Sequence, residues 1–132
     1  MLRPLLLLAF LVALRGDALA GDAEPSGLDL LERCHTLELM DQGGQQPDER
    51  MLRDYGYCLG FLVGFVSGFA ARDAAGEAGR FCPPPDARIR DFADAIRAWL
   101  VQNPDGLQQM GAVVALQALQ WRYPCTGKAG TQ

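Results

Sequence analysis

Four cysteines place the strongest constraint on the fold of this 132-residue chain. They are Cys34, Cys58, Cys82 and Cys125, and the even number suits a small core that is held together by disulfides. No CxxC or HxxxH spacing is present and His35 is the only histidine, so a zinc site is not expected. We therefore predict two disulfides and no bound metal or other cofactor.

The amino terminus has the pattern of a secretory signal peptide. A basic residue precedes an unbroken apolar run over residues 5–14, and a small-x-small cleavage pattern ends at Ala20. The run is shorter than the roughly 20 apolar residues that a membrane span needs. We expect residues 1–20 to be removed, residues 21–125 to form one helical domain, and residues 126–132 to form a flexible tail.

Apolar residues recur at the spacing of an α-helix in four segments of the chain. Ser26, Asp48 and Asp86 are placed to cap the first three helices, and Asn103-Pro104 is placed to end the third and open the fourth. The predicted fold is all-α, a compact bundle of four, or four to five, helices stapled by two disulfides. The expected helices cover residues 27–40, 48–72, 86–102 and 104–123.

The positions of the cysteines along these helices predict how they pair. Cys34 lies about two turns before the end of the first helix and Cys58 about three turns into the second, so an antiparallel arrangement brings them to similar heights. Cys82 precedes the third helix and Cys125 follows the fourth, at one end of an antiparallel pair. We favour Cys34 with Cys58 and Cys82 with Cys125, from the three pairings that four cysteines allow.

Four glycines recur at every fourth position of the second helix, so they form one narrow stripe on its surface. Each costs about 1 kcal/mol relative to alanine in a helix interior, so a compensating contact is expected. The stripe predicts close packing against a neighbouring helix, and it would also suit a homodimer. The apolar run around it, residues 57–71, is too short to indicate a membrane span in the mature chain. The stripe consists of Gly56, Gly60, Gly64 and Gly68.

The third and fourth helices each carry large apolar residues at the spacing of one helix face. Trp99 in the third helix, and Met110 and Trp121 in the fourth, fall at this spacing. We therefore predict that these side chains pack in the core and do not form a cofactor site.

The charge pattern and the polar residues exclude some classes of function. The formal net charge is −4 and the basic residues are scattered among acidic ones, so no nucleic acid partner is expected. His35 is next to Cys34, but a disulfide would remove the free thiolate that a nucleophile needs. The carboxylates of Asp91 and Asp94 fit a solvated helix face. We therefore predict that the chain is not an enzyme.

Several short cysteine, glycine and proline motifs follow one another along nearly the whole mature chain. They are Leu30-Leu31-Glu32-Arg33-Cys34, Cys58-Leu59-Gly60-Phe61-Leu62-Val63-Gly64, Phe81-Cys82-Pro83-Pro84, the turn at Pro104, Ala118-Leu119 and Tyr123-Pro124-Cys125. In order and spacing this set resembles the Rap/Tai family of immunity proteins. In Gram-negative bacteria these proteins protect the periplasm against peptidoglycan amidase toxins delivered by type VI secretion.

The resemblance implies a periplasmic protein that binds an amidase effector and inhibits it sterically. Family members are typically helical dimers that insert a loop toward the catalytic cysteine and histidine of the toxin. In this chain the connection over residues 73–86 is the first candidate for that loop, because it is the longest and is stiffened by prolines. The alternative is a small periplasmic helical chaperone, or a stress-related binding protein, without a cognate toxin. The candidate contact residues are Glu77, Arg80, Phe81, Pro83, Pro84 and Pro85.

Overall fold

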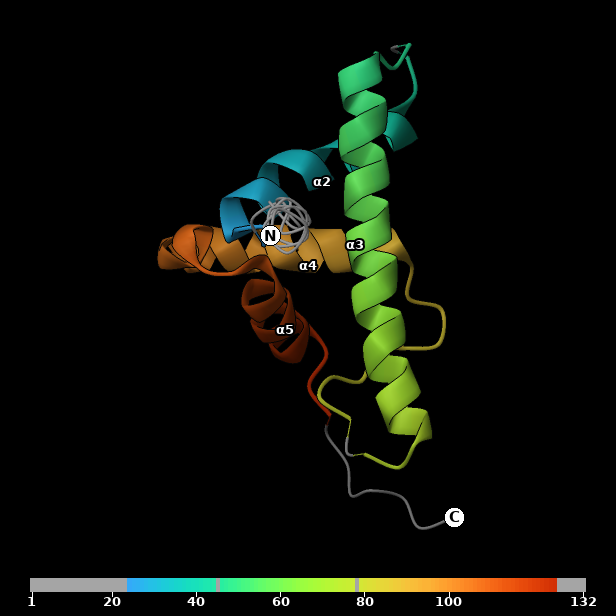
Figure 1. Ribbon diagram of the computed structural model, residues 1–132, viewed down its shortest axis with the longest axis vertical. Helices are drawn as coiled ribbons and strands as arrows, with labels where there is room; N and C mark the ends of the chain where they lie inside the picture. Colours follow the sequence, from blue (N-terminus) through green and yellow to red (C-terminus); the bar gives the residue numbers. More distant parts are fainter. Residues whose placement is uncertain (1–23, 45, 78, 126–132) are drawn as a thin grey trace, which may run out of the picture.

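The computed structural model describes residues 24–44, 46–77 and 79–125, and these residues are all helices and connections (Figure 1). The predicted signal peptide, its cleavage after Ala20 and the predicted tail lie outside the described residues. The described chain contains no strand beyond an isolated bridge between Ser26 and Met110, so the predicted all-α fold is confirmed. The elements are α2 (Gly27–Gln42), α3 (Glu49–Ala74), α4 (Ile89–Gln102), the 3₁₀-helix η1 (Pro104–Gln108) and α5 (Gly111–Arg122).

Side chains at the predicted positions cap the first two described helices. The Ser26 hydroxyl accepts a hydrogen bond from the Asp29 N–H at 3.2 Å, and the Asp29 carboxylate accepts one from the Ser26 N–H at 2.8 Å. The hydroxyl and the N–H of Ser26 lower the pKa of Asp29, because both donate to its ionised form. Asp48 caps α3 by accepting a hydrogen bond from the Met51 N–H at 2.7 Å.

The start of α4 differs from the prediction. Asp86 does not cap it, because α4 begins at Ile89 with Arg88 as the N-cap residue. The Arg88 N–H donates to the Asp91 carboxylate at 2.8 Å. The Ala87 N–H donates to the Pro84 carbonyl at 3.0 Å, so residues 84–87 form a turn and the helix begins only after it.

The fourth predicted helix is divided into η1 and α5. The prediction that Pro104 opens this helix is therefore wrong for α5. Pro104 opens η1 instead, and the chain is extended at Gln109 before α5 begins at Gly111. This break lets the chain pair with the segment before α2. The Gly27 N–H donates to the Gln109 carbonyl at 2.9 Å, and the Gly111 N–H donates to the Pro25 carbonyl at 2.5 Å. In one continuous helix the Gln109 carbonyl would instead be used inside the helix.

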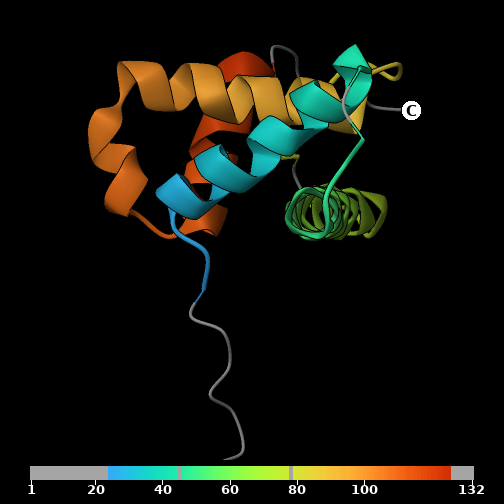
Figure 2. The same cartoon turned by 90° about the horizontal axis from the view of Figure 1, so that it is seen from above.

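The core lies where α2, α4 and α5 pack together, and α3 stands beside these helices (Figure 2). α3 extends beyond α2 and α4 along the long axis of the molecule in Figure 1. Its only buried residues are Cys58 and Leu62, whereas α4 and α5 each bury five residues. The largest fully buried side chains are Leu30, Leu62, Ile96, Leu119 and Val114.

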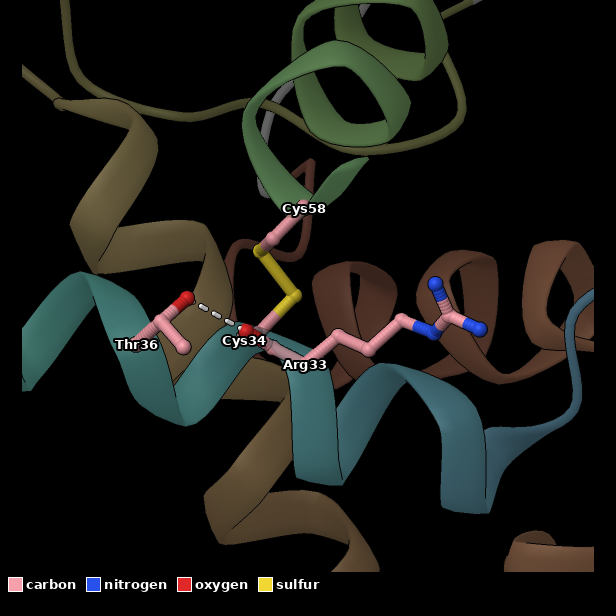
Figure 3. The surroundings of a disulfide bond; sticks show 4 residues. All are labelled: Arg33, Cys34, Thr36 and Cys58. Atoms are coloured by element: carbon pink, nitrogen blue, oxygen red, sulfur yellow. Dashed lines mark hydrogen bonds between the residues drawn. A yellow bond between two sulfur atoms is a disulfide. The ribbon is translucent and has the colours of Figure 1, made fainter. Parts of the chain in front are cut away.

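Both predicted disulfides are present. The Cys34–Cys58 bond joins α2 to α3 with a Cα–Cα distance of 5.1 Å, and Figure 3 shows it between the two helices. The Cys82–Cys125 bond joins the segment ahead of α4 to the end of the described chain, with a Cα–Cα distance of 5.0 Å. Loop-closure entropy assigns each bond about 3–4 kcal/mol. This is a large part of the stability of a small domain.

The glycine stripe of α3 is not packed against another helix of this chain. A methyl group at Gly56, Gly60, Gly64 or Gly68 would meet no atom of the surrounding described chain within 4 Å. The prediction that the stripe packs closely inside the fold is therefore wrong for the described residues. The reason lies in the register of α3: the side that carries Cys58 and Leu62 meets the core, and the stripe lies on the other side of the helix.

Replacing Gly27 by alanine tests the close approach of α2 to η1. A methyl group at Gly27 would overlap the Gly106 carbonyl oxygen and lie 3.2 Å from the Leu107 Cα atom, and both belong to backbone. We expect Gly27→Ala to lower the free energy of unfolding by about 2 kcal/mol. Gly56→Ala is the matched control, because the space there is open and alanine favours a helix by about 1 kcal/mol. Urea denaturation of both variants measures the difference, and a Gly27→Ala variant as stable as the wild type would contradict this packing.

Candidate functional site

The α3–α4 loop, residues 75–77 and 79–88, is held in place near both of its ends. Next to α3, the Arg72 Nε atom donates to the Glu77 carboxylate at 2.7 Å. Farther along, the Cys82 N–H donates to the Tyr123 carbonyl at 2.8 Å, beside the Cys82–Cys125 disulfide. A hydrogen bond and a covalent bond therefore fix the same part of the loop to the end of α5. Such a loop is preorganised for binding.

Phe81 anchors the same loop to the side of α3. Its side chain is only 5% exposed, and its ring centroid lies 5.3 Å from that of Phe69 and 6.5 Å from that of Phe65. Phe61 continues this row, with its ring centroid 5.8 Å from that of Phe65. Aromatic rings at these distances attract one another beyond the effect of burial. The row therefore determines where the loop lies.

The predicted contact residues do not all offer their side chains to a partner. Phe81 is buried against α3, so it positions the loop from within the fold. Pro83 is half-buried beside it. Glu77 is exposed but already paired with Arg72. The exposed residues of the predicted set are Glu77, Arg80, Pro84 and Pro85.

One face of α3 is apolar and open. Leu52 is 50% exposed and Val63 is 43% exposed, and the glycine stripe lies on the same side of the helix. No charged residue occurs from Tyr55 to Ala71. By length and composition alone α3 could cross a membrane, and only 11% of its most apolar window is buried. An open apolar face of this length is typical of a surface that meets another molecule.

A groove of about 410 Å³ lies between the start of α4 and the end of α5. Trp121 lines it and is 47% exposed, so the prediction that Trp121 packs in the core is wrong. The buried face of α5 is centred on Ala115 and Ala118, and Trp121 falls at its edge in the last turn. Met110 is also exposed, because it precedes α5. Trp99 does pack against the core, although it is only partly buried.

Tyr123 lies beside Trp121 in the lining of the groove. Its ring meets the Phe92 ring edge-on at 5.8 Å between centroids, and its side chain is 9% exposed. Burial raises the pKa of Tyr123, the charge of Arg122 opposes this effect, and the charges of Asp91 and Asp94 add to it. The phenol is therefore a neutral hydrogen-bonding group at physiological pH.

Ion pairs join α2 to α4 on the surface. Arg90 pairs with Asp41 at 2.6 Å, and Arg97 pairs with Glu38 at 2.7 Å. The Nδ1 atom of His35 lies 3.5 Å from the same Glu38 carboxylate, on the exposed side of α2. Exposed pairs of this kind contribute about 0–1 kcal/mol each, so they orient the two helices more than they stabilise them. His35 belongs to this surface network.

Neither a free thiol nor a cluster of metal-ligating side chains is found among the described residues. All four cysteines are in disulfides, so none is free to act as a nucleophile. Within the described ranges, no group of three or more histidine, cysteine, aspartate or glutamate side chains could hold a metal ion. What the fold does assemble is an anchored loop, an open helix face and a groove. These features belong to a small helical protein that is stapled by two disulfides and has open surfaces.

The comparison with protein families is specific. A family model described as Rap1a immunity proteins matches residues 26–125, which include all the described helices and both disulfides. The chain therefore belongs to the Rap1a immunity protein family, and the resemblance carried by its motifs is confirmed. The family supports a role as an immunity protein, and proteins of this kind are generally not enzymes. No curated protein and no solved structure shows a significant match to the chain.

Truncating Phe81 tests whether its ring holds the α3–α4 loop. We expect Phe81→Ala to lower the free energy of unfolding by about 3 kcal/mol, because it leaves a cavity against Phe65 and Phe69. The loosened loop should also be cut faster by trypsin after the exposed Arg80. Val101→Ala, at an exposed position of α4, is the control. Unchanged stability and unchanged cleavage of Phe81→Ala would show that the disulfide and the Cys82–Tyr123 hydrogen bond hold the loop without the ring.

Proposed function

We propose that this protein is a periplasmic immunity protein that binds a peptidoglycan amidase effector of a type VI secretion system and blocks its active site sterically. The family match over residues 26–125 is the observation that carries the proposal. The cysteine, glycine and proline motifs of the chain resemble family members that inhibit such amidases. An inhibitor of this kind needs a rigid surface and no catalytic residues of its own, and the two disulfides supply a rigid frame.

The cysteine chemistry supports action in the periplasm. Paired cysteines persist in an oxidising compartment and are rare in the cytosol. The sequence of residues 1–20 also has the pattern of a signal peptide that is cleaved after Ala20. An amidase that cleaves peptidoglycan acts in that compartment too, so the inhibitor and the toxin would meet there.

The exposed tip of the α3–α4 loop is the proposed contact with the cleft of the effector. Arg80, Pro84 and Pro85 are exposed there. Phe81 attaches the loop to α3, and Cys82 attaches it to Cys125. A loop fixed in this way loses little conformational entropy when it enters a cleft. Arg80 adds a charged group that could reach the rim of the cleft.

Periplasmic co-expression with the amidase-like product of a neighbouring gene tests this function. We expect the full-length chain to restore growth, and residues 21–132 without a leader to give no protection, because the inhibitor would then remain in the cytosol. The double substitution Arg80→Glu with Pro84→Asp should weaken binding by about tenfold or more, because it reverses a charge and adds one at the contact. Isothermal titration calorimetry with the purified effector measures this change.

Asp105→Asn is the matched control for these loop variants, because Asp105 is an exposed carboxylate on η1. It should bind the effector as the wild type does. If cells die equally with and without the protein, the proposed function is wrong. If the double loop variant protects as well as the wild type, the effector meets a different surface.

We also propose that the open face of α3 joins two copies of the chain. Four glycines weaken the helix, and no contact in the described chain compensates for them. A second α3 could approach this stripe closely and remove Leu52 and Val63 from water. The uncharged stretch between Asp54 and Arg72 spans about 25 Å. Because this is shorter than the roughly 30 Å hydrocarbon core of a bilayer, a protein surface suits it better than a membrane.

Leucine at the stripe tests this dimer. We expect the mature wild type to have the mass of two chains, and Gly60→Leu with Gly64→Leu to have the mass of one, because the added side chains prevent close approach. Size-exclusion chromatography with light scattering measures the mass, and circular dichroism checks that the helices remain. Val101→Leu is the control at an exposed position of α4. A wild type that stays monomeric, or one that floats with lipid vesicles, would contradict the proposal.

A further inference from the structure

We infer that the groove between α4 and α5 binds a basic side chain, a lysine or an arginine, that a partner protein inserts. The inference rests on the proposed function, in that the partner is the effector. The lining combines an exposed indole, a phenol and three carboxylates, which together suit a cation. These residues are Trp121, Tyr123, Asp86, Asp91 and Asp94.

Tyr123 carries a hydroxyl group that has no hydrogen-bond partner among the described residues. Its side chain is nine-tenths buried, and its hydroxyl makes no hydrogen bond to a described residue. No side-chain oxygen of the described residues is both sealed from solvent and unpaired, so solvent reaches this hydroxyl, and Tyr123 belongs to the lining of the groove. Water can bond to a hydroxyl in this position until a ligand takes its place. The hydroxyl oxygen can accept a hydrogen bond from an ammonium or guanidinium group.

Trp121 supplies an aromatic surface beside that hydroxyl. Its large ring is half-exposed at the end of α5, where burial in the core would have been more favourable. The face of an indole attracts a cation more strongly than the face of a phenol or a phenyl ring. Tryptophan is also one of the residue types that contribute most to binding at protein interfaces.

The carboxylates supply the negative charges of the groove. Asp91 holds the start of α4 and lies 3.8 Å from Arg88, and Asp94 is paired with Arg97 at 3.0 Å and with Arg90 at 3.8 Å. Asp86 is exposed at the groove and has no ion-pair partner among the residues described. Arg122 is the one basic residue of the lining, and its guanidinium lies 5.3 Å from the centre of the Tyr123 ring. Asp86 is therefore the carboxylate of the lining that remains to pair with an incoming cation.

The groove is built before any partner arrives. The Cys82–Cys125 disulfide and the hydrogen bond from the Cys82 N–H to the Tyr123 carbonyl hold its two walls together. Its lining includes Ala95 and Ala98 of α4, so no long side chain from α4 fills that side. Pro84 belongs both to the exposed tip of the α3–α4 loop and to the groove. A partner that covers the loop therefore also reaches the groove.

Three substitutions test the groove without disturbing the core. Trp121→Ala and Asp86→Asn should each weaken binding of the effector by about tenfold. Tyr123→Phe removes the hydroxyl but keeps the ring on Phe92, and it should weaken binding by about fivefold. Asp105→Asn on η1 is the control and should bind as the wild type does. Calorimetry gives the dissociation constants, and circular dichroism confirms that each variant is folded.

A second measurement uses a defined probe and needs no effector. The intrinsic fluorescence of the mature protein is followed during titration with acetylated tri-arginine amide, and with the matched tri-citrulline peptide, which lacks the charge. We expect the arginine peptide alone to change the emission, and Trp121→Phe to abolish that change. Equal responses to the two peptides, or no response, would overturn the inference.

The two proposals fail in different ways. If the wild type does not bind the effector, the proposed function is wrong, and the peptide titration decides whether the groove takes a basic side chain. If the wild type binds the effector and the three groove variants bind it equally well, the groove inference is wrong while the proposed function stands.

Discussion

The disulfide between Cys34 and Cys58 is the interaction on which the position of α3 depends. α3 is 26 residues long, yet it buries only Cys58 and Leu62 in the core. Burial of these two side chains contributes a few kcal/mol, about 1.5–3 for each large apolar group, and partly buried side chains such as Phe65 and Phe69 add to it. This is little against the cost of ordering a helix of this length. A covalent bond to α2 reduces that cost, because the unfolded chain is already restrained. The apolar face of α3 can then remain open to solvent.

The second disulfide acts on a different part of the molecule. Cys82 is joined to Cys125 and also donates its N–H to the Tyr123 carbonyl, so the α3–α4 loop and the end of α5 are fixed to each other. Phe81 adds an apolar contact to α3 from the neighbouring position of the loop. The exposed loop tip and the groove beside Trp121 are therefore parts of one rigid region. Rigidity of this kind favours recognition by shape, because a partner need not pay for ordering the surface.

Local signals in the sequence predicted most of the fold. The spacing of apolar residues locates the helices, and it involves only residues that are close in the sequence. The caps at Ser26 and Asp48 and the pairing of the cysteines follow from the positions of these helices. The division of the fourth helix was not predictable in this way. It depends on backbone hydrogen bonds between two segments that are far apart in the sequence, one at Gly27 and one at Gly111. Periodicity also could not show that Trp121 lies at the edge of a buried face. Tertiary packing decides whether an apolar face meets the core or the solvent. The spacing of residues along one helix carries no information about that packing.

The register of α3 makes the proposed surfaces compatible with one another. Successive residues of a helix turn by about 100°, so Phe61, Phe65 and Phe69 form a row on one side and the glycine stripe lies on a different side. The α3–α4 loop packs on the phenylalanine row through Phe81. A second α3 packed on the stripe would therefore approach from a direction about 100° around the helix from the row that carries the loop. The two copies of such a dimer would each present one contact region, and each region could engage an effector without separating the pair.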